Sequence, residues 1–194
     1  MIAQAGLREH LRAATHDAHR GLDRRFDALD LASRPAFARF LAAHAIALAP
    51  LQARYAAFAA DTLGCAAPDH PAMLVADLAD LAVDAAGLPS LDDDAVPGGG
   101  EAGLAYVLAG SRMGMAVLRK RAAWGAGQGL ARRFLDDREG LGVWRAFLAR
   151  DVPAGEPGDE APGDSTALTR ARATAIATFA HYHAALDRAL ALAA

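Results

Sequence analysis

Apolar residues recur along this chain at intervals of three and four, and they seldom alternate with polar ones. β-Branched residues are sparse, so few segments carry the side chains that suit a strand. The pattern is clearest near the N-terminus, where one stripe consists of Leu7, Leu11, Ala14, Ala18, Leu22 and Leu29. The sequence therefore predicts an all-α protein without strands.

Length and composition favour a single domain over residues 1–194. The 194 residues are enough for one well-buried core, and 54% of them are hydrophobic against 22% that are charged. The formal net charge of -3 provides no general attraction to nucleic acid or to an anionic membrane. We therefore expect neither as a partner.

The expected cellular compartment is indicated by the cysteine content and by the lack of targeting or membrane-spanning segments in the sequence. Its one cysteine, Cys65, cannot form an internal disulfide and has no metal-ligand motif around it. Charged residues from Arg8 onward come too early for a signal peptide. The most apolar stretch, residues 37–51, is interrupted by Arg39, His44 and Pro50 and is too short to cross a bilayer. We expect a cytoplasmic protein.

Helix boundaries in the first half follow from proline, glycine and serine positions. Ser33 is expected to cap a second helix that runs to about residue 63 and is kinked at Pro50. A third helix is expected over about residues 71–86. Residues 88–100 contain two prolines and three successive glycines, so they are predicted to form a loop.

The second half is predicted to begin with a helix over residues 102–121 and a bend over 124–129. Two shorter helices are expected next, divided near residues 140–142. Residues 152–165 are rich in Pro, Gly and acidic side chains and are expected to be an exposed linker. One long helix over residues 166–194 completes the single domain.

Three glycines lie inside the helix expected over residues 102–121, although each interior glycine costs roughly 1 kcal/mol relative to alanine. Gly103, Gly110 and Gly114 fall within ~40° of one another around the helix axis. Such a bare face fits either a closely packed neighbouring helix or a bound ligand, and spacing alone does not choose between them.

A polar constellation is expected on the first helix. Thr15, His19 and Asp23 follow at four-residue intervals, so they share a face at the edge of the buried stripe. A metal-ligating histidine needs a neutral ring whose second N–H is held by an acceptor, and Asp23 is one turn away. The alternative interpretation is an ordinary surface pair between His19 and Asp23.

The other histidines carry weaker signals. His44 and His70 are expected to be an ordinary helical and an ordinary loop histidine. A metal cluster around His19 lacks the Glu-x-x-His pairs of a di-iron helical bundle, so it is not expected. Its members would be His16, His19, His181 and His183.

Two segments together resemble the two haem-contacting helices of the haem oxygenase family. They are residues 11–19, LRAATHDAH, and residues 105–114, AYVLAGSRMG. The similarity is closest to the bacterial branch associated with bacteriophytochromes, and it extends more weakly through residues 144–148, WRAFL. Both motifs occur in the right order, so the resemblance covers most of the chain.

The resemblance implies a haem oxygenase-like fold in which haem is sandwiched between a proximal and a distal helix. His19 would be the proximal iron ligand, while Gly110 and Gly114 would let the distal helix approach the porphyrin and steer oxygen toward one of its carbons. Family enzymes cleave haem to biliverdin, carbon monoxide and ferrous iron with O2 and external electrons. Haem is thus both substrate and cofactor. The implied partners are a ferredoxin-type or reductase-type electron donor and a bacteriophytochrome that accepts biliverdin.

The same resemblance extends to further site residues. Ser111 stands where the animal enzymes have an aspartate, and Met115 where many members have a second glycine. Two alternatives remain open: a haem-binding or haem-sensing protein of this fold without turnover, and a helical interaction module without haem. Thr15 and Asp23 complete the expected cofactor-binding set around His19. The expected propionate-binding side chains are Arg12, His16, Arg145 and Arg150.

Overall fold

The structure is a computed structural model, and it describes residues 6–119, 130–150 and 162–192. Within these ranges every regular element is helical and no strand occurs, so the prediction of an all-α protein is confirmed for them. The elements in chain order are α1 (Leu7–Asp27), α2 (Arg34–Leu48), α3 (Gln52–Phe58), the π-helical turn η1 (Ala59–Leu63), α4 (His70–Asp80), the 3-10 turns η2 (Ala85–Gly87) and η3 (Asp93–Ala95), α5 (Glu101–Leu118), α6 (Arg133–Asp136), α7 (Glu139–Ala149) and α8 (Pro162–Leu190).

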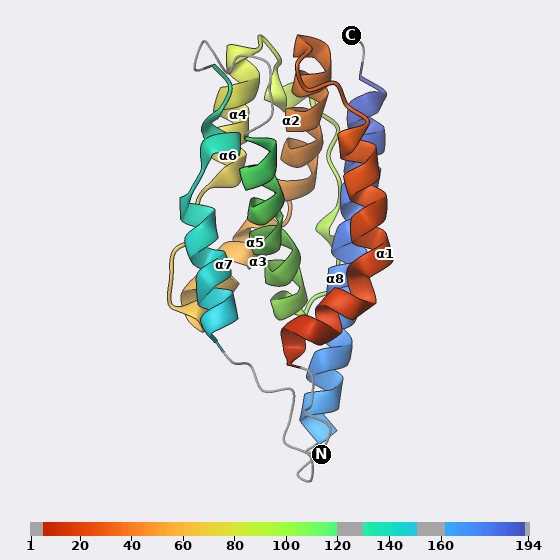
Figure 1. The fold of residues 1–194 in the computed structure, drawn as a ribbon, viewed down its shortest axis with the longest axis vertical. Helices are drawn as coiled ribbons and strands as arrows, with labels where there is room; N and C mark the ends of the chain where they lie inside the picture. The colour runs from red at the N-terminus through yellow and green to blue at the C-terminus, as the bar shows by residue number, and fades with distance from the viewer. Residues whose placement is uncertain (1–5, 120–129, 151–161, 193–194) are drawn as a thin grey trace.

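The long helix α8 packs along α1, α2 and α5, and α5 also packs against α7. Figure 1 shows α5 in the middle of the molecule, with α1 and α8 on one side of it and α7 on the other. The core lies among these helices. Its fully enclosed side chains include Leu11, Phe37, Phe40, Leu41, Leu104 and Leu108.

Helix α2 consists mostly of apolar residues, and most of its side chains lie in the core of the fold. Phe37 and every residue from Phe40 to Leu48 are buried, so no face of its second half needs a polar side chain. Among the described residues no single helix is long and apolar enough to cross a membrane. Helix α2 passes that test only together with residues 52–63, from which it is bent by 65°.

The start of α2 and its break are as predicted. Ser33 is the N-cap, since its side chain accepts a hydrogen bond from the backbone N–H of Ala36 at 3.4 Å. The predicted kink at Pro50 is confirmed, and the chain there divides into α2 and α3.

The predicted end of the third helix is wrong. Helix α4 stops at Asp80 rather than near residue 86, because Ala82 adopts a left-handed conformation with φ 53°. The N–H of Ala82 bonds to the carbonyl of Ala79, and the N–H of Val83 bonds to that of Leu78, both at 2.9 Å. This pair of bonds closes a helix end, a position at which glycine is the usual residue.

The division between the two shorter helices also lies elsewhere than predicted. Asp137 interrupts the helical run, and its Oδ1 accepts from the N–H of Glu139 at 2.8 Å, which allows α7 to begin there. Gly140, at the predicted division, lies inside α7. A Cβ at Gly140 would stand 2.9 Å from Cγ of Arg112, so this glycine serves close packing and not a chain break.

Helix α8 begins at Pro162. Residues 162–165 are therefore helical, which corrects the prediction that the linker extends over 152–165. The rest of that linker up to residue 161, and the predicted bend over 124–129, lie outside the described residues. The long C-terminal helix is confirmed as far as Leu190.

Candidate functional site

A pocket of about 610 Å³ lies between α1 and α5. Helices α2 and α8 contribute aromatic side chains to it, and α7 contributes Trp144. Most of the predicted site residues line this one cavity, so the structure brings the two sequence motifs together. Those that line it are Arg12, Thr15, His16, His19, Asp23, Gly110, Ser111, Gly114 and Met115.

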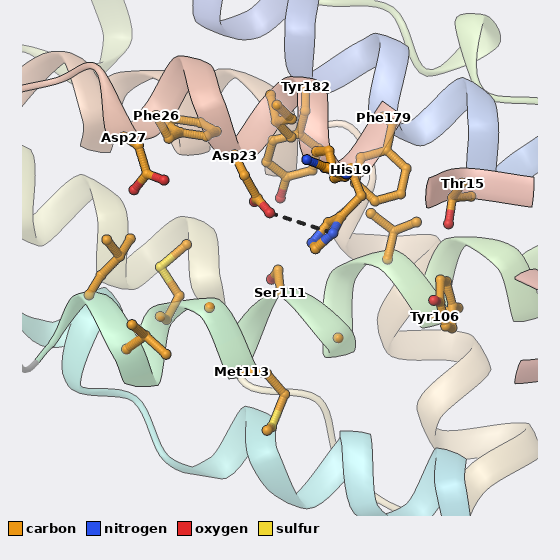
Figure 2. A pocket seen from close by; sticks show the side chains of 18 of the residues that line it. Thr15, His19, Asp23, Phe26, Asp27, Tyr106, Ser111, Met113, Phe179 and Tyr182 are labelled. Carbon is orange, nitrogen blue, oxygen red and sulfur yellow. Dashed lines mark ion pairs between the residues drawn. The ribbon is translucent and has the colours of Figure 1, made fainter. Parts of the chain in front are cut away.

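Figure 2 shows the pocket with His19 and Asp23 on α1 above and Ser111 on α5 below. Nδ1 of His19 lies 3.5 Å from Oδ2 of Asp23, and the two side chains are 59% and 56% exposed. The ring of Phe179 meets the His19 ring edge-on, with centroids 5.6 Å apart. If Nδ1 carries the proton and donates it to Asp23, Nε2 of His19 presents a lone pair.

The described residues contain no group of three or more His, Cys, Asp or Glu side chains that could hold a metal ion. His16 and His19 line the pocket, whereas His181 is buried against α2, where its Nε2 lies 3.1 Å from the carbonyl oxygen of Ala47. A metal ion bound in this pocket would therefore have few protein ligands and would need most of its ligands from a second molecule. The iron of haem meets that condition, because the porphyrin supplies most of its ligands.

The glycines of α5 serve two different purposes. A Cβ at Gly103 would stand 1.9 Å from the carbonyl oxygen of Ala171, so this glycine permits close contact with α8. A Cβ at Gly110 would meet the ring of Trp144 at 3.5 Å, an ordinary contact, and one at Gly114 would meet nothing within 4 Å. Gly103 thus follows the helix-packing interpretation of the bare glycine face, whereas Gly110 and Gly114 line the pocket.

Ser111 lies between these two glycines and is turned toward α1 in Figure 2. Its hydroxyl donates to the carbonyl oxygen of Leu108 at 2.7 Å. Thr15, opposite on α1, donates in the same way to Leu11 at 2.7 Å. Both hydroxyl protons are therefore directed to the backbone of their own helices and away from the cavity.

His44 is more than the ordinary helical histidine that its sequence context predicts, because it lines the pocket from α2. Its Nδ1 lies 2.8 Å from the carbonyl oxygen of Phe40, and burial lowers its pKa to about 4. The ring is therefore neutral at pH 7. Four aromatic rings surround it with centroids 4.4–5.8 Å away, namely Phe26, Phe40, Phe134 and Tyr182.

His70, predicted to lie in a loop, is the first residue of α4 and is buried. Its Nε2 lies 3.0 Å from Oδ2 of Asp137, and the Nε of Arg112 lies 3.4 Å from the same oxygen. The Arg112 guanidinium stacks over the ring of Phe134 at 4.6 Å. Burial lowers the pKa of His70 even though Asp137 opposes that shift. This cluster joins α4, α5 and the α6–α7 turn outside the pocket.

Charges of opposite sign occupy different parts of the α1 rim. Arg12 lies seven residues before His19 and Arg20 one residue after it, and Asp23 and Asp27 follow one and two turns later. The rim is thus basic toward the N-terminal half of α1 and acidic toward its C-terminal end.

Two of the predicted propionate-binding residues are not part of this rim. Arg145 and Arg150 are exposed and do not line the pocket, although Trp144 beside Arg145 does. Sequence reasoning also missed several lining residues. Spacing could have found Arg20, four residues after His16, and Tyr106, four residues before Gly110. No local signal pointed to Phe179 or Tyr182, which come from α8.

A comparison with known protein families found no match, and a search of curated proteins found none similar to this chain.

Proposed function

We propose that this chain is a haem oxygenase that binds haem between α1 and α5 and cleaves it to biliverdin, carbon monoxide and ferrous iron. The observation that carries the proposal is the position of His19. It faces the cavity from α1, while Gly110, Ser111 and Gly114 line the same cavity from α5. The resemblance of both segments to the haem-contacting helices of that family supports the same assignment.

His19 has the surroundings that an iron ligand requires. Asp23, 3.5 Å away, is placed to hold the Nδ1 proton, which leaves the Nε2 lone pair for a metal. The edge-on contact with Phe179 limits the rotation of the ring. A half-exposed imidazole at the pocket edge also needs little rearrangement to accept a ligand.

Helix α5 offers the flat surface that the other side of a porphyrin requires. At Gly114 a ligand could approach the backbone without meeting a side chain, because the position of the absent Cβ is open. The cavity volume of about 610 Å³ lies within the roughly 300–1,000 Å³ of typical cofactor sites. Arg12, His16 and Arg20 line the same pocket and would bind the two propionate carboxylates.

Bound haem would supply the redox chemistry, with O2 as oxidant and electrons from a ferredoxin-type or reductase-type donor. The residues of the chain would bind and orient it. His19 would fix one face of the ring, and α5 would restrict access to the other. The apolar rings of Phe26, Phe40 and Phe179 would keep water out of the space between them.

A haem-binding protein without turnover is the second candidate, and the geometry of Ser111 is the observation that favours it. The serine donates its proton to Leu108, so it cannot at the same time donate into the cavity. Met115 adds a buried side chain to the pocket wall where many family members have glycine. Both features bear on turnover.

One assay separates these candidates. The protein is titrated with haemin, and the complex is then given a reductant and oxygen while its absorption spectrum is recorded. We expect binding of one haem per chain and its conversion to biliverdin with release of carbon monoxide. A stable complex that yields no bilin would select the binding protein. Failure to develop a haem absorption band would reject both.

A further inference from the structure

Three polar side chains of the pocket share an arrangement that the proposed cleavage of haem does not use. Ser111, His44 and Thr15 each direct a polar atom at the carbonyl oxygen three or four residues earlier in their own helix, at 2.7–2.8 Å. A carbonyl oxygen only accepts, so each of these side chains must be the donor. Each has a single proton when neutral, and that proton is already used.

Ser111 and His44 both line the cavity, and toward a ligand they can therefore act only as acceptors. His44 stays neutral because its pKa is lowered to about 4 by burial, and with Nδ1 bonded to Phe40 the remaining ring nitrogen, Nε2, carries a lone pair. The Ser111 oxygen keeps its lone pairs for a ligand. The interior of the pocket is thus supplied with hydrogen-bond acceptors from α2 and α5.

A donor lies in the same interior. Tyr182 of α8 lines the pocket and is 4% exposed, and burial raises the pKa of its phenol, so the O–H is retained at neutral pH. Thr15 and Tyr106, which also line the pocket, interact with each other. Ser111, His44 and Tyr182 therefore leave the interior two acceptors and one donor. The charged donors Arg12 and Arg20 lie on the α1 rim, where they suit carboxylates.

Haem and its open-chain product differ in how they match this interior. In haem all four ring nitrogens bind iron, so the macrocycle presents neither N–H donors nor carbonyl acceptors. An open-chain tetrapyrrole presents both, as pyrrolic N–H groups and terminal lactam oxygens. Both molecules carry two propionates, so the basic rim does not distinguish between them. Buried polar groups without a partner destabilise a complex, and the interior favours the ligand that pairs them.

We propose that Ser111 and His44 make this pocket selective for open-chain tetrapyrroles by accepting their N–H groups. The proposal rests on the proposed function for the identity of the ligand class as tetrapyrrole.

The test compares two probes, biliverdin and ferric haem, each titrated separately into the full chain. Ser111→Ala removes one acceptor without adding bulk. We expect it to weaken biliverdin binding about fivefold, the usual effect of one hydrogen bond, and to change haem binding less than twofold. Thr178→Val is the matched control, because Thr178 donates to Thr174 at 2.8 Å in the same manner but does not line the pocket. It should change neither affinity.

His44→Leu removes the second acceptor and is expected to act in the same direction. Because the His44 ring is fully buried, thermal melting of the His44→Leu variant is measured as well. If that variant does not fold, the biliverdin affinity of Ser111→Ala alone tests the proposal. Unchanged biliverdin affinity in Ser111→Ala, or an equal loss for both probes, would overturn the proposal. Wild-type chain that binds neither probe would overturn it as well.

The two proposals fail in different ways. If the chain binds haem and cleaves it while Ser111→Ala leaves biliverdin affinity unchanged, the oxygenase assignment stands and the selectivity is wrong. If the chain binds biliverdin with the expected dependence on Ser111 but binds no haem, the selectivity stands and the oxygenase assignment is wrong.

Discussion

At the scale of the residue, the His19 side chain is held by its neighbours and is still accessible from solvent. Asp23 and Phe179 each contact the ring, yet the side chain remains 59% exposed. A ring held in this way can bind a metal without moving far, and it can also be replaced by a small molecule that enters from solvent. In a variant that lacks the His19 ring, a small ligand from solvent could therefore take the place of the imidazole.

His19→Ala is expected to remove the nitrogen ligand from haem iron, to change the iron's absorption spectrum and to abolish most turnover. Added imidazole should restore the spectrum in part, since the space left by the ring is open to solvent. Asp23→Asn should be milder and lower haem affinity by up to about tenfold, because it disturbs only the ligand's orientation and basicity. His16→Ala is the control within the same pocket. A spectrum that responds to His16→Ala and not to His19→Ala would show that the ligand is misassigned.

At the scale of the element, α5 has two glycine-dependent contacts along one helix. Its first turns pack against the backbone of α8 through Gly103, and its later turns border the pocket at Gly110 and Gly114. The two interpretations of a bare glycine face, helix packing and ligand contact, therefore both apply, but to different parts of the helix.

Substitutions at Gly103 and Gly114 should separate stability from haem binding. Gly103→Ala forces a Cβ against the backbone of Ala171 and is expected to lower the free energy of unfolding by about 1–3 kcal/mol. Gly114→Ala should leave the apo-protein as stable or stabilise it by up to about 1 kcal/mol, since glycine is the poorer helix former.

Gly114→Val should fold and yet show an altered haem spectrum or a changed bilin isomer, because its methyl groups enter open pocket space. Thermal melting of the apo-proteins and haem turnover per bound haem measure the two effects. Normal turnover in Gly114→Val would remove this glycine from the site.

Helix α1 carries the basic rim, and its contribution can be measured against α7. Arg12→Ala combined with Arg20→Ala should weaken haem binding several-fold, since an exposed charge pair contributes ~0–1 kcal/mol. Arg145→Ala, which removes an arginine outside the pocket, should leave haem affinity unchanged. Titration of the three proteins with haemin at low and high salt gives the comparison. A larger loss in Arg145→Ala would place the propionates at α7 instead.

The sequence predicts elements better than it predicts their ends. Ser33 is identified as a cap because its type and position follow a known rule. The end of α4 at Asp80 is missed because the alanine at position 82 gives no signal for the left-handed conformation that it adopts. The motifs on α1 and α5 can be found from four-residue spacing, whereas His44 and Tyr182 join them only after α2 and α8 have packed.

At the scale of the whole molecule, three buried histidines couple the fold to pH. They come from three helices, namely His44 in α2, His70 in α4 and His181 in α8, and burial lowers the pKa of each from 6.5. A histidine that stays neutral in the folded state but takes a proton in the unfolded state favours unfolding in acid. The contribution is therefore complete above about pH 6.5 and is lost as the pH falls below it. Asp137, whose pKa is also lowered, adds a further loss at more acidic pH.

The free energy of unfolding should consequently fall as the pH is lowered from 8 to 5. For His44 alone, with its pKa near 4 when folded, the loss between pH 6.5 and 4 is about 3 kcal/mol at 1.36 kcal/mol per unit. Urea unfolding at a series of pH values measures the slope. His44→Leu should reduce that slope by one proton, because the unfolded chain then has one fewer group to titrate. Phe40→Leu, which only loosens packing around the His44 ring, should lower stability at every pH and leave the slope unchanged. A wild-type stability that stays flat from pH 8 to 5 would contradict the burial of neutral histidines in this fold.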